Sequence, residues 1–211
     1  MQYLKTYLKK ITDRGNTKLA ESIEKTANDV GNKHIKTFSF SSHEIGLLLG
    51  NVQSGKTGQM FGIISKATDL GFPVFLLLTT DNVVLQQQTL DRVKADLEGY
   101  CICGENDARV FTDNSLLQPT IVVLKKNVRM LKLWANIFNS TGFMKGNPLF
   151  IVDDEADAAS LNTLVNRDKQ SSINKYLDSI KNGSSSSIYL QVTGTPQAIL
   201  LQTMASGWHP Y

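Results

Sequence analysis

The chain has 211 residues, of which 41% are hydrophobic and 19% charged, and its formal net charge at pH 7 is +3. This balance excludes an intrinsically disordered chain, and the length suits one α/β domain with short appendages. The mild charge neither requires nor excludes nucleic acid as a partner. No apolar run approaches the roughly 20 residues of a membrane span and no signal peptide is recognisable. The only cysteines, Cys101 and Cys103, lack other ligands at metal-binding spacing. We therefore expect a cytoplasmic protein with reduced thiols and no membrane partner.

The first part of the chain predicts two helices. Apolar side chains recur at helical spacing on either side of a break at Gly15-Asn16. They are Leu4, Tyr7, Leu8 and Ile11 before the break, and Leu19, Ile23, Ala27 and Val30 after it. We expect this N-terminal helical extension, residues 1–40, to be separate from the core of the domain that follows.

From about residue 45, strands and helices alternate, which predicts an α/β fold with a mostly parallel central sheet flanked by helices. The expected strands are residues 45–49, 74–79, 120–124, 149–152 and 188–193, with a weaker strand at 109–111. The expected helices are residues 57–69, 82–98, 127–139, 168–181 and 197–204. The main domain would then span residues 41–206, and residues 207–211 would begin a linker.

The segment from Gly50 to Thr57 fits the pattern G-x-x-x-x-G-K-[ST], typical of a phosphate-binding loop between a strand and a helix. Glycines let backbone N–H groups surround a phosphate, and the helix N-terminus adds partial positive charge. Lys56 is expected to bind the β- and γ-phosphates of ATP, and the Thr57 hydroxyl to bind Mg²⁺. The residues expected to bind the nucleotide are Gly50, Val52, Gln53, Ser54, Gly55, Lys56, Thr57 and Gly58.

A run of carboxylates follows the apolar strand at residues 149–152. In P-loop ATPases, an aspartate at this place holds Mg²⁺, and an adjacent glutamate can orient the attacking water. We assign these roles to Asp154 and Glu155, with Asp153 as a capping or supporting group. A register one residue earlier, in which Asp153 holds the metal, stays open as an alternative.

Two hydroxyl residues, Thr193 and Thr195, follow one another closely at the end of the last strand, before Pro196. Short hydroxyl side chains at this place can hydrogen-bond Asp157, the last acid of the tetrapeptide Asp-Glu-Ala-Asp, and sense the γ-phosphate. We expect Asp157, Thr193 and Thr195 to couple the site to the rest of the domain.

The ordered set of motifs resembles the first RecA-like domain of superfamily-two helicases and translocases. Gly50–Thr57 resembles motif I, Asp154–Asp157 resembles motif II, and Thr193–Pro196 resembles motif III. The stretch from Leu78 to Gln88 resembles motif Ia, which contacts the nucleic-acid backbone in that superfamily. The resemblance implies ATP and Mg²⁺ as cofactors, DNA as a partner, and a second RecA-like domain that supplies arginine fingers.

The segment Gly50–Thr57 is also similar to the G-x-V-Q-S-G-K-T of the bacterial Z-one domain family of helicase-like ATPases. Residues 88–92, 124–127 and 159–163 agree with that family. Its members often lie in restriction-modification or anti-phage loci, so the resemblance implies a role in DNA restriction or defence, with a nuclease or methyltransferase as a further partner. The chain departs from the family at motif III, where Gly194 stands in place of an expected alanine.

Four polar side chains in loops or first helical turns are expected to contact nucleic-acid phosphates. They are Thr80, Asn82, Gln86 and Lys125. For Lys125, and for Lys126 beside it, a solvated helix start is an equally weighted alternative. Phe38 and Phe40 could stack on adenine, although packing is the more common role for aromatic residues before a strand.

Two functions from different classes remain open. The leading one is an ATP-binding and hydrolysing motor domain of a DNA helicase or translocase. The alternative is a P-loop nucleotide switch that changes partner contacts without translocation, and a small-molecule kinase is disfavoured. Because the chain ends at Tyr211 after one phosphate loop and one acidic motif, we expect a weak ATPase that needs a second RecA-like domain. The arginines that could act in trans through self-association are Arg92, Arg109, Arg129 and Arg167.

Overall fold

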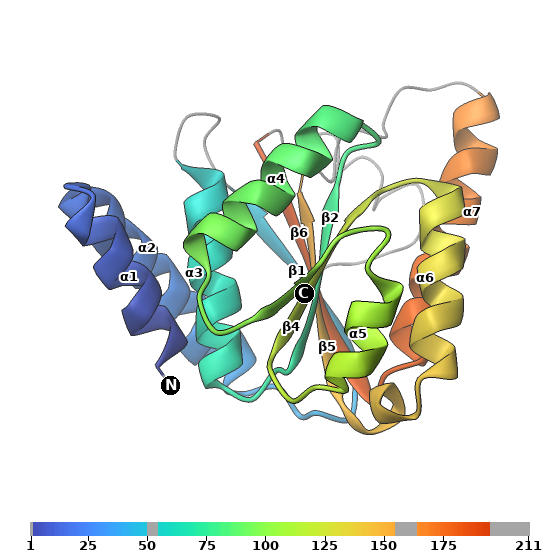
Figure 1. Ribbon diagram of the computed structural model, residues 1–211, viewed down its shortest axis with the longest axis horizontal. Coiled ribbons are helices and arrows are strands. Elements are labelled where there is room, and N and C mark those ends of the chain that lie inside the picture. The colour runs from blue at the N-terminus through green and yellow to red at the C-terminus, as the bar shows by residue number, and fades with distance from the viewer. Residues whose placement is uncertain (1, 50–54, 155–163, 195–211) are drawn as a thin grey trace.

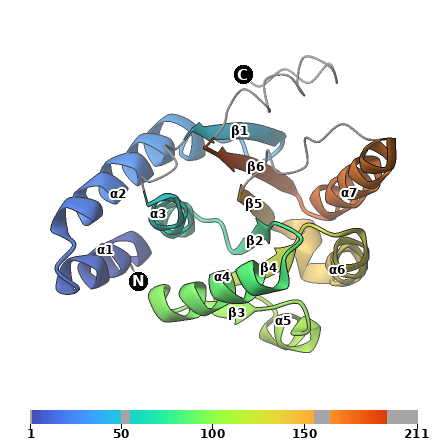
Figure 2. The same ribbon diagram turned by 90° about the horizontal axis from the view of Figure 1, so that it is seen from above.

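A computed structural model of the protein describes residues 2–49, 55–154 and 164–194, with side chains from residue 171 onward in the last range. Its centre is a six-stranded sheet in the order β1-β6-β5-β2-β4-β3, and all paired strands are parallel. Helices cover both faces of the sheet (Figures 1 and 2). This α/β architecture is the predicted one, and it is compatible with a RecA-like fold.

The strands are β1 (His43–Leu49), β2 (Val74–Thr79), β3 (Cys101–Cys103), β4 (Thr120–Lys125), β5 (Pro148–Asp154) and β6 (Ser186–Thr193). The helices are α1 (Tyr3–Asp13), α2 (Thr17–Val30), α3 (Lys56–Asp69), α4 (Val83–Asp96), α5 (Ala108–Asn114), α6 (Val128–Ser140) and α7 (Leu164–Asn182). A π-helical turn, η1 (Gly31–Ile35), extends α2, and a short 3₁₀ helix, η2 (Gly142–Gly146), follows α6. Within the described ranges, none of the helices has the length and apolar character needed to cross a membrane.

The sheet separates two apolar cores, one on each face. Successive side chains of a strand point to opposite faces, so Phe75 and Leu77 of β2 join the core under α1 to α4. Leu76 and Leu78 join the core under α5 to α7. Because β2 is buried on both faces, its sequence is a continuous apolar run rather than an alternating one.

The N-terminal helices are part of the first core rather than separate from it, contrary to prediction. Tyr7 of α1 and Ile23 of α2 are buried in the same cluster as Phe61 of α3. The Tyr7 hydroxyl lies 3.4 Å from the carbonyl oxygen of Gly58, to which it donates a hydrogen bond. The apolar stripes correctly predicted two helices, but a stripe does not say which surface will cover it.

One smaller prediction was wrong. Residues 109–111 lie in α5, where Phe111 is buried and Val110 is 49% exposed, and the strand of this region is β3. A short apolar run fits a strand and a helix equally well, which explains the error. The expected helix at residues 197–204 lies outside the described residues.

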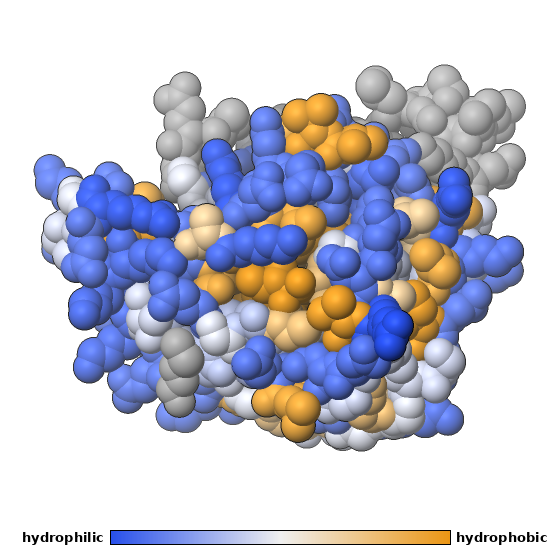
Figure 3. All heavy atoms as spheres, in the orientation of Figure 1, coloured by the Kyte–Doolittle hydropathy of each residue, from blue (hydrophilic) through white to orange (hydrophobic). Residues whose placement is uncertain are grey.

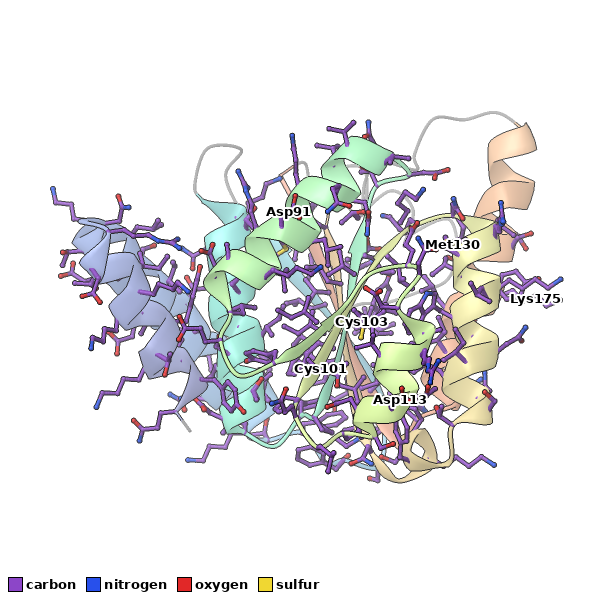
Figure 4. All side chains as sticks on the ribbon, viewed as in Figure 1. Asp91, Cys101, Cys103, Asp113, Met130 and Lys175 are labelled. Carbon is purple, nitrogen blue, oxygen red and sulfur yellow. The ribbon has the colours of Figure 1, made fainter. Side chains whose placement is uncertain are left out.

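Cys101 and Cys103 on β3 are free thiols, as predicted, with sulfur atoms 3.9 Å apart (Figure 4).

Phe38 and Phe40 pack on Phe72, with ring centroids 5.6 Å and 5.4 Å from it. Phe72 lies two residues before the start of β2, and Phe40 lies three residues before the start of β1, so this aromatic cluster lies at the amino ends of the strands. The phosphate-loop segment follows the carboxyl end of β1. The packing interpretation of these two rings is therefore correct.

Helix α2 packs closely on α3 because α3 has glycines where the two helices meet. A Cβ atom at Gly62 would lie 2.4 Å from Cγ2 of Ile23, and one at Gly58 would lie 3.1 Å from its Cδ1. Ile23 is fully buried, so the helices have no room to separate without opening the core.

We predict that Gly62→Ala lowers the free energy of unfolding by about 1–3 kcal/mol, because the added methyl group overpacks the contact with Ile23. The better helix propensity of alanine, worth up to about 1 kcal/mol, offsets part of this loss. Urea unfolding measures the difference. Gly142→Ala is the matched control, since a Cβ there would meet no atom within 4 Å.

The double variant Gly62→Ala/Ile23→Ala should lose less stability than the sum of the two single variants, because the contact is then relieved. A Gly62→Ala protein as stable as wild type would contradict the tight packing of α2 on α3.

Candidate nucleotide-binding site

The motifs predicted from the sequence meet at one edge of the sheet. Leu49, which ends β1, pairs with Thr193 of β6, and Asp154, which ends β5, pairs with Val192 of β6. Strand β6 therefore lies between the strand that leads into the phosphate-loop segment and the strand that ends in carboxylates. The carboxyl edge of a parallel sheet is where ligands bind in open α/β folds.

A cavity of about 210 Å³ opens at this edge. It is lined by the N-terminus of α3, the ends of β2 and β5, and one side of α4: Lys56, Thr57, Thr79, Thr80, Leu85, Gln88, Thr89, Arg92 and Asp154. The cavity thus unites three of the described residues that the sequence assigned to phosphate and Mg²⁺, namely Lys56, Thr57 and Asp154. Its volume is below the roughly 300–1,000 Å³ typical of ligand sites.

The backbone turns sharply into α3 at Gly55, whose φ is +66°. Glycine adopts this left-handed conformation without strain, so it allows the helix to start at Lys56. The first N–H groups of a helix have no acceptor within the helix and give its N-terminus partial positive charge. Lys56 and the start of α3 therefore both favour an anion in the cavity.

Several residues of the predicted phosphate loop lie outside the described part of the chain, and Gly58 contacts the N-terminal helices. Gly50, Val52, Gln53 and Ser54 lie outside the described residues. Gly58 packs against Ile23 and Tyr7 of the N-terminal helices. Its lack of a side chain is explained by helix packing within the described part of the chain.

The two adjacent aspartates of β5 point to opposite faces of the sheet. Asp154 lines the cavity with Lys56 and Thr57. Asp153 is buried on the other face, where its Oδ1 lies 2.7 Å from Nζ of Lys126. Its Oδ2 accepts a hydrogen bond of 2.6 Å from the Tyr189 hydroxyl. Both oxygens of Asp153 thus have protein partners away from the cavity, whereas Asp154 lies at the cavity, and the metal-binding role of Asp154 stays a prediction.

The Asp153 carboxylate joins three parts of the sheet edge: β5, β6 through Tyr189, and the loop after β4 through Lys126. The side chains of Lys126 and Asp153 are only 11% and 4% exposed. Burial, and then the nearby carboxylate, raise the pKa of Tyr189 well above its ordinary value, so the phenol stays protonated and donates. We did not predict this network, although strand alternation places Tyr189 and Asp153 on one face.

Helix α4 presents one stripe of side chains to the cavity: Leu85, Gln88, Thr89 and Arg92, spaced three and four residues apart. The helix starts where Asn82 accepts hydrogen bonds from the N–H groups of Val84 and Leu85, at 2.9 Å and 3.1 Å. Nη1 of Arg92 lies 3.5 Å from Oγ1 of Thr57. The sequence suggested Arg92 only as an arginine that acts on the nucleotide site of another copy of the chain. The helical spacing of Leu85, Gln88, Thr89 and Arg92 was the signal that could have placed Arg92 at the cavity of its own chain.

The four residues expected to contact nucleic acid occupy different environments. Thr80 lines the cavity, and its buried hydroxyl oxygen has no hydrogen-bond partner among the described residues. Asn82 caps α4. Lys125 lies 3.5 Å from Glu105, and both side chains are 15% exposed.

Gln86 is 6% exposed, and its amide donates a hydrogen bond of 3.2 Å to the carbonyl oxygen of Val123. Gln86 therefore has a structural role that the sequence did not predict. Its amide is buried rather than exposed for the expected contact with nucleic acid.

The remaining predicted site residues fall at the limits of the described chain. Thr193 is buried at the end of β6. Glu155, Asp157 and Thr195 lie outside the described residues, so their roles stay predictions.

An apolar patch lies at the rim of the cavity, at the N-terminal end of α4. Val83, Val84 and Leu85 are 66%, 62% and 43% exposed. Figure 3 shows apolar side chains gathered at this end of the molecule. Exposed apolar side chains in one place are typical of a surface that another protein or domain covers.

No family model and no curated protein matches the sequence. Among solved structures, the fold is similar to that of a nuclease-deletion mutant of the Type ISP restriction-modification enzyme LlaGI in complex with a DNA substrate mimic. The TM-score is 0.56 at 18% identity, and the match covers 82% of this chain and 17% of the enzyme. At this identity, the similarity shows a shared fold over a small part of that enzyme.

We predict that Tyr189→Phe lowers the free energy of unfolding at neutral pH by about 1–3 kcal/mol, because buried Asp153 loses a hydrogen bond. Above a pH of about 10, an unfolded tyrosine ionises, whereas the buried phenol with its raised pKa stays protonated. Wild type should therefore lose stability faster than the variant, by about 1.4 kcal/mol per pH unit, and the two should converge.

Urea unfolding from neutral to alkaline pH measures both effects. Tyr176→Phe, at a partly buried tyrosine on α7, is the control and should show a smaller loss at neutral pH. A difference between wild type and Tyr189→Phe that stays constant with pH would contradict the protonated Tyr189–Asp153 contact.

Proposed function

We propose that the chain is the nucleotide-binding domain of an ATP-driven motor of the superfamily-two helicase or translocase type, acting on DNA in restriction or defence. The observation that carries this proposal is the cavity that unites Lys56, Thr57 and Asp154 at the carboxyl edge of the parallel sheet. The fold shared with part of a restriction-modification enzyme supports the biological setting.

Three described residues of the cavity have a defined task in this proposal. Lys56 and the N-terminus of α3 bind the negatively charged phosphates. The Thr57 hydroxyl and the Asp154 carboxylate supply oxygen ligands, the type that Mg²⁺ prefers. Mg²⁺, when bound, would neutralise charge on the phosphates. Glu155, the next residue after Asp154, would orient the attacking water.

DNA as the partner is supported by the likeness to motif Ia and by two linked loops at the same edge. The backbone N–H of Lys126 donates to the carbonyl oxygen of Thr79 at 2.8 Å, and Asn127 donates to Asp81 at 3.1 Å. The loops after β2 and β4 are thus tied together, and Lys126 joins them to Asp153 beside Asp154. A DNA strand bound at these loops could therefore shift Asp154, the proposed metal ligand, through these contacts.

A second RecA-like domain would complete the site. The apolar patch of Val83, Val84 and Leu85 at the rim of the cavity suits a protein surface. We propose that this domain covers the nucleotide and contacts the patch.

One observation favours the alternative, a nucleotide switch that does not act on nucleic acid. The side chains expected to contact DNA are engaged within the domain: Gln86 with β4, Asn82 with the start of α4, and Lys125 with Glu105. A domain of this kind could still change protein contacts when the phosphate cavity fills.

We predict that Lys56→Ala weakens ATP binding about ten- to a hundredfold, because a hydrogen bond to a charged group is worth about 1.5–3 kcal/mol. Calorimetric titration with ATP and Mg²⁺ measures the affinity. Lys175→Ala is the matched control, since Lys175 is exposed on α7 and points away from the domain (Figure 4). Equal affinity in wild type and Lys56→Ala would refute the nucleotide site.

We predict that Glu155→Gln binds ATP but hydrolyses it about 10²–10⁴-fold more slowly, because the amide cannot act as a base. In a motor, the DNA affinity of this variant differs between the ATP and ADP states, since coupling between two sites is reciprocal. Fluorescence anisotropy with labelled DNA measures these affinities. The absence of DNA binding in both states, together with turnover that DNA does not change, would favour the switch over the motor.

A further inference from the structure

We propose that Arg92 binds the γ-phosphate of ATP, so that the chain supplies an arginine to its own nucleotide site. This inference rests on the proposed function and deepens it. Arg92 lines the same cavity as Lys56 and Asp154, and its Nη1 lies 3.5 Å from Oγ1 of Thr57. That distance is at the outer limit of a hydrogen bond, so this contact is one that a better acceptor can replace.

The position of Arg92 is set by a well-packed helix. Leu90 and Val93 on either side of it are buried in the first core, and Asn82 fixes the start of α4. Lys56 enters the cavity from α3, whereas Arg92 enters it from α4, which crosses the same face of the sheet (Figure 2). A phosphate held by Lys56 would therefore have a second cation on another wall of the cavity.

The chemistry of Thr57 decides where the guanidinium goes when nucleotide binds. In the proposed function, Oγ1 of Thr57 is a ligand of Mg²⁺. The metal would then replace the Arg92 guanidinium at this oxygen, because two cations repel each other at one site. Arg92 must then leave Thr57, and the nearest acceptors of matching charge are the phosphate oxygens beside the metal. A planar guanidinium with parallel N–H donors suits phosphate oxygens better than an ammonium does.

The γ-phosphate is the best candidate among these acceptors. In the proposed function, Lys56 binds the β- and γ-phosphates from α3, whereas Arg92 lines the same cavity from α4, together with Thr89 of that helix. Arg109, by contrast, is 93% exposed on α5, where it pairs with Asp113 at 3.4 Å. Arg92 is thus the arginine that the described part of the chain directs into this cavity.

The test compares Arg92→Gln with Arg109→Gln, which removes the same charge from an exposed position. Calorimetric titration with a non-hydrolysable ATP analogue and with ADP, each with Mg²⁺, measures affinity without turnover. We expect Arg92→Gln to weaken binding of the ATP analogue about ten- to a hundredfold and to change ADP binding much less. Arg92→Lys keeps the charge and loses the planar fork, so its affinity should be intermediate. Arg109→Gln should bind both ligands as wild type does.

Unchanged affinity for the ATP analogue in Arg92→Gln, together with a loss in Lys56→Ala, would overturn the role of Arg92 and leave the nucleotide site standing. Equal losses for the ATP analogue and ADP would overturn the assignment to the γ-phosphate. If Lys56→Ala also bound as wild type does, the proposed function itself would fail. Urea unfolding establishes that each variant is folded, and Arg92→Lys serves as the test if Arg92→Gln does not fold.

Discussion

Neighbouring side chains of a β-strand must point to opposite faces of the sheet, and this constraint divides the work of the two aspartates at the end of β5. Asp154 turns toward α3 and α4, where Lys56, Thr57 and Arg92 also lie. Asp153 turns toward α6 and α7, where it is held between Lys126 and Tyr189. A buried carboxylate is costly unless it is paired and hydrogen-bonded, and both conditions are met on that face. Asp153 can therefore stabilise the fold while Asp154 faces the cavity.

The order of the strands also links the two halves of the candidate site at the carboxyl edge of the sheet. Because β6 lies between β1 and β5, anything that displaces the end of β6 acts on both halves of the candidate site. Tyr189 of β6 and Asp153 of β5 share a hydrogen bond, so the two strand ends are joined by a side chain as well as by the ladder of the sheet. Lys126 brings the loop after β4 into the same network. The site is thus supported by contacts that cross four neighbouring strands.

Much of this arrangement follows from local sequence. The apolar runs at residues 74–79 and 149–152 predicted β2 and β5 within three residues, since long buried strands leave a clear signal. The pattern ending in Lys56 and Thr57 predicted that these residues would meet Asp154, because parallel strands bring their carboxyl ends together. The burial of Gln86 and the direction of Arg92 were not predictable in this way. Both depend on how α4 packs, and its run Gln86-Gln87-Gln88 gives little indication of which polar side chain is covered.

The close packing of α2 on α3 also bears on how this domain can be shortened or recombined. Ile23 and Ala27 are fully buried, and the glycines of α3 leave bare backbone where these side chains lie. Trimming the chain to the α/β alternation would expose that backbone and the apolar surface around it to water. A shortened chain of this kind would be prone to aggregation, and grafting the phosphate-binding segment onto another scaffold would require a replacement for the missing cover. Residues 1–40 thus act as part of the wall behind the helix that begins at Lys56, and an exchange of domains should keep them with it.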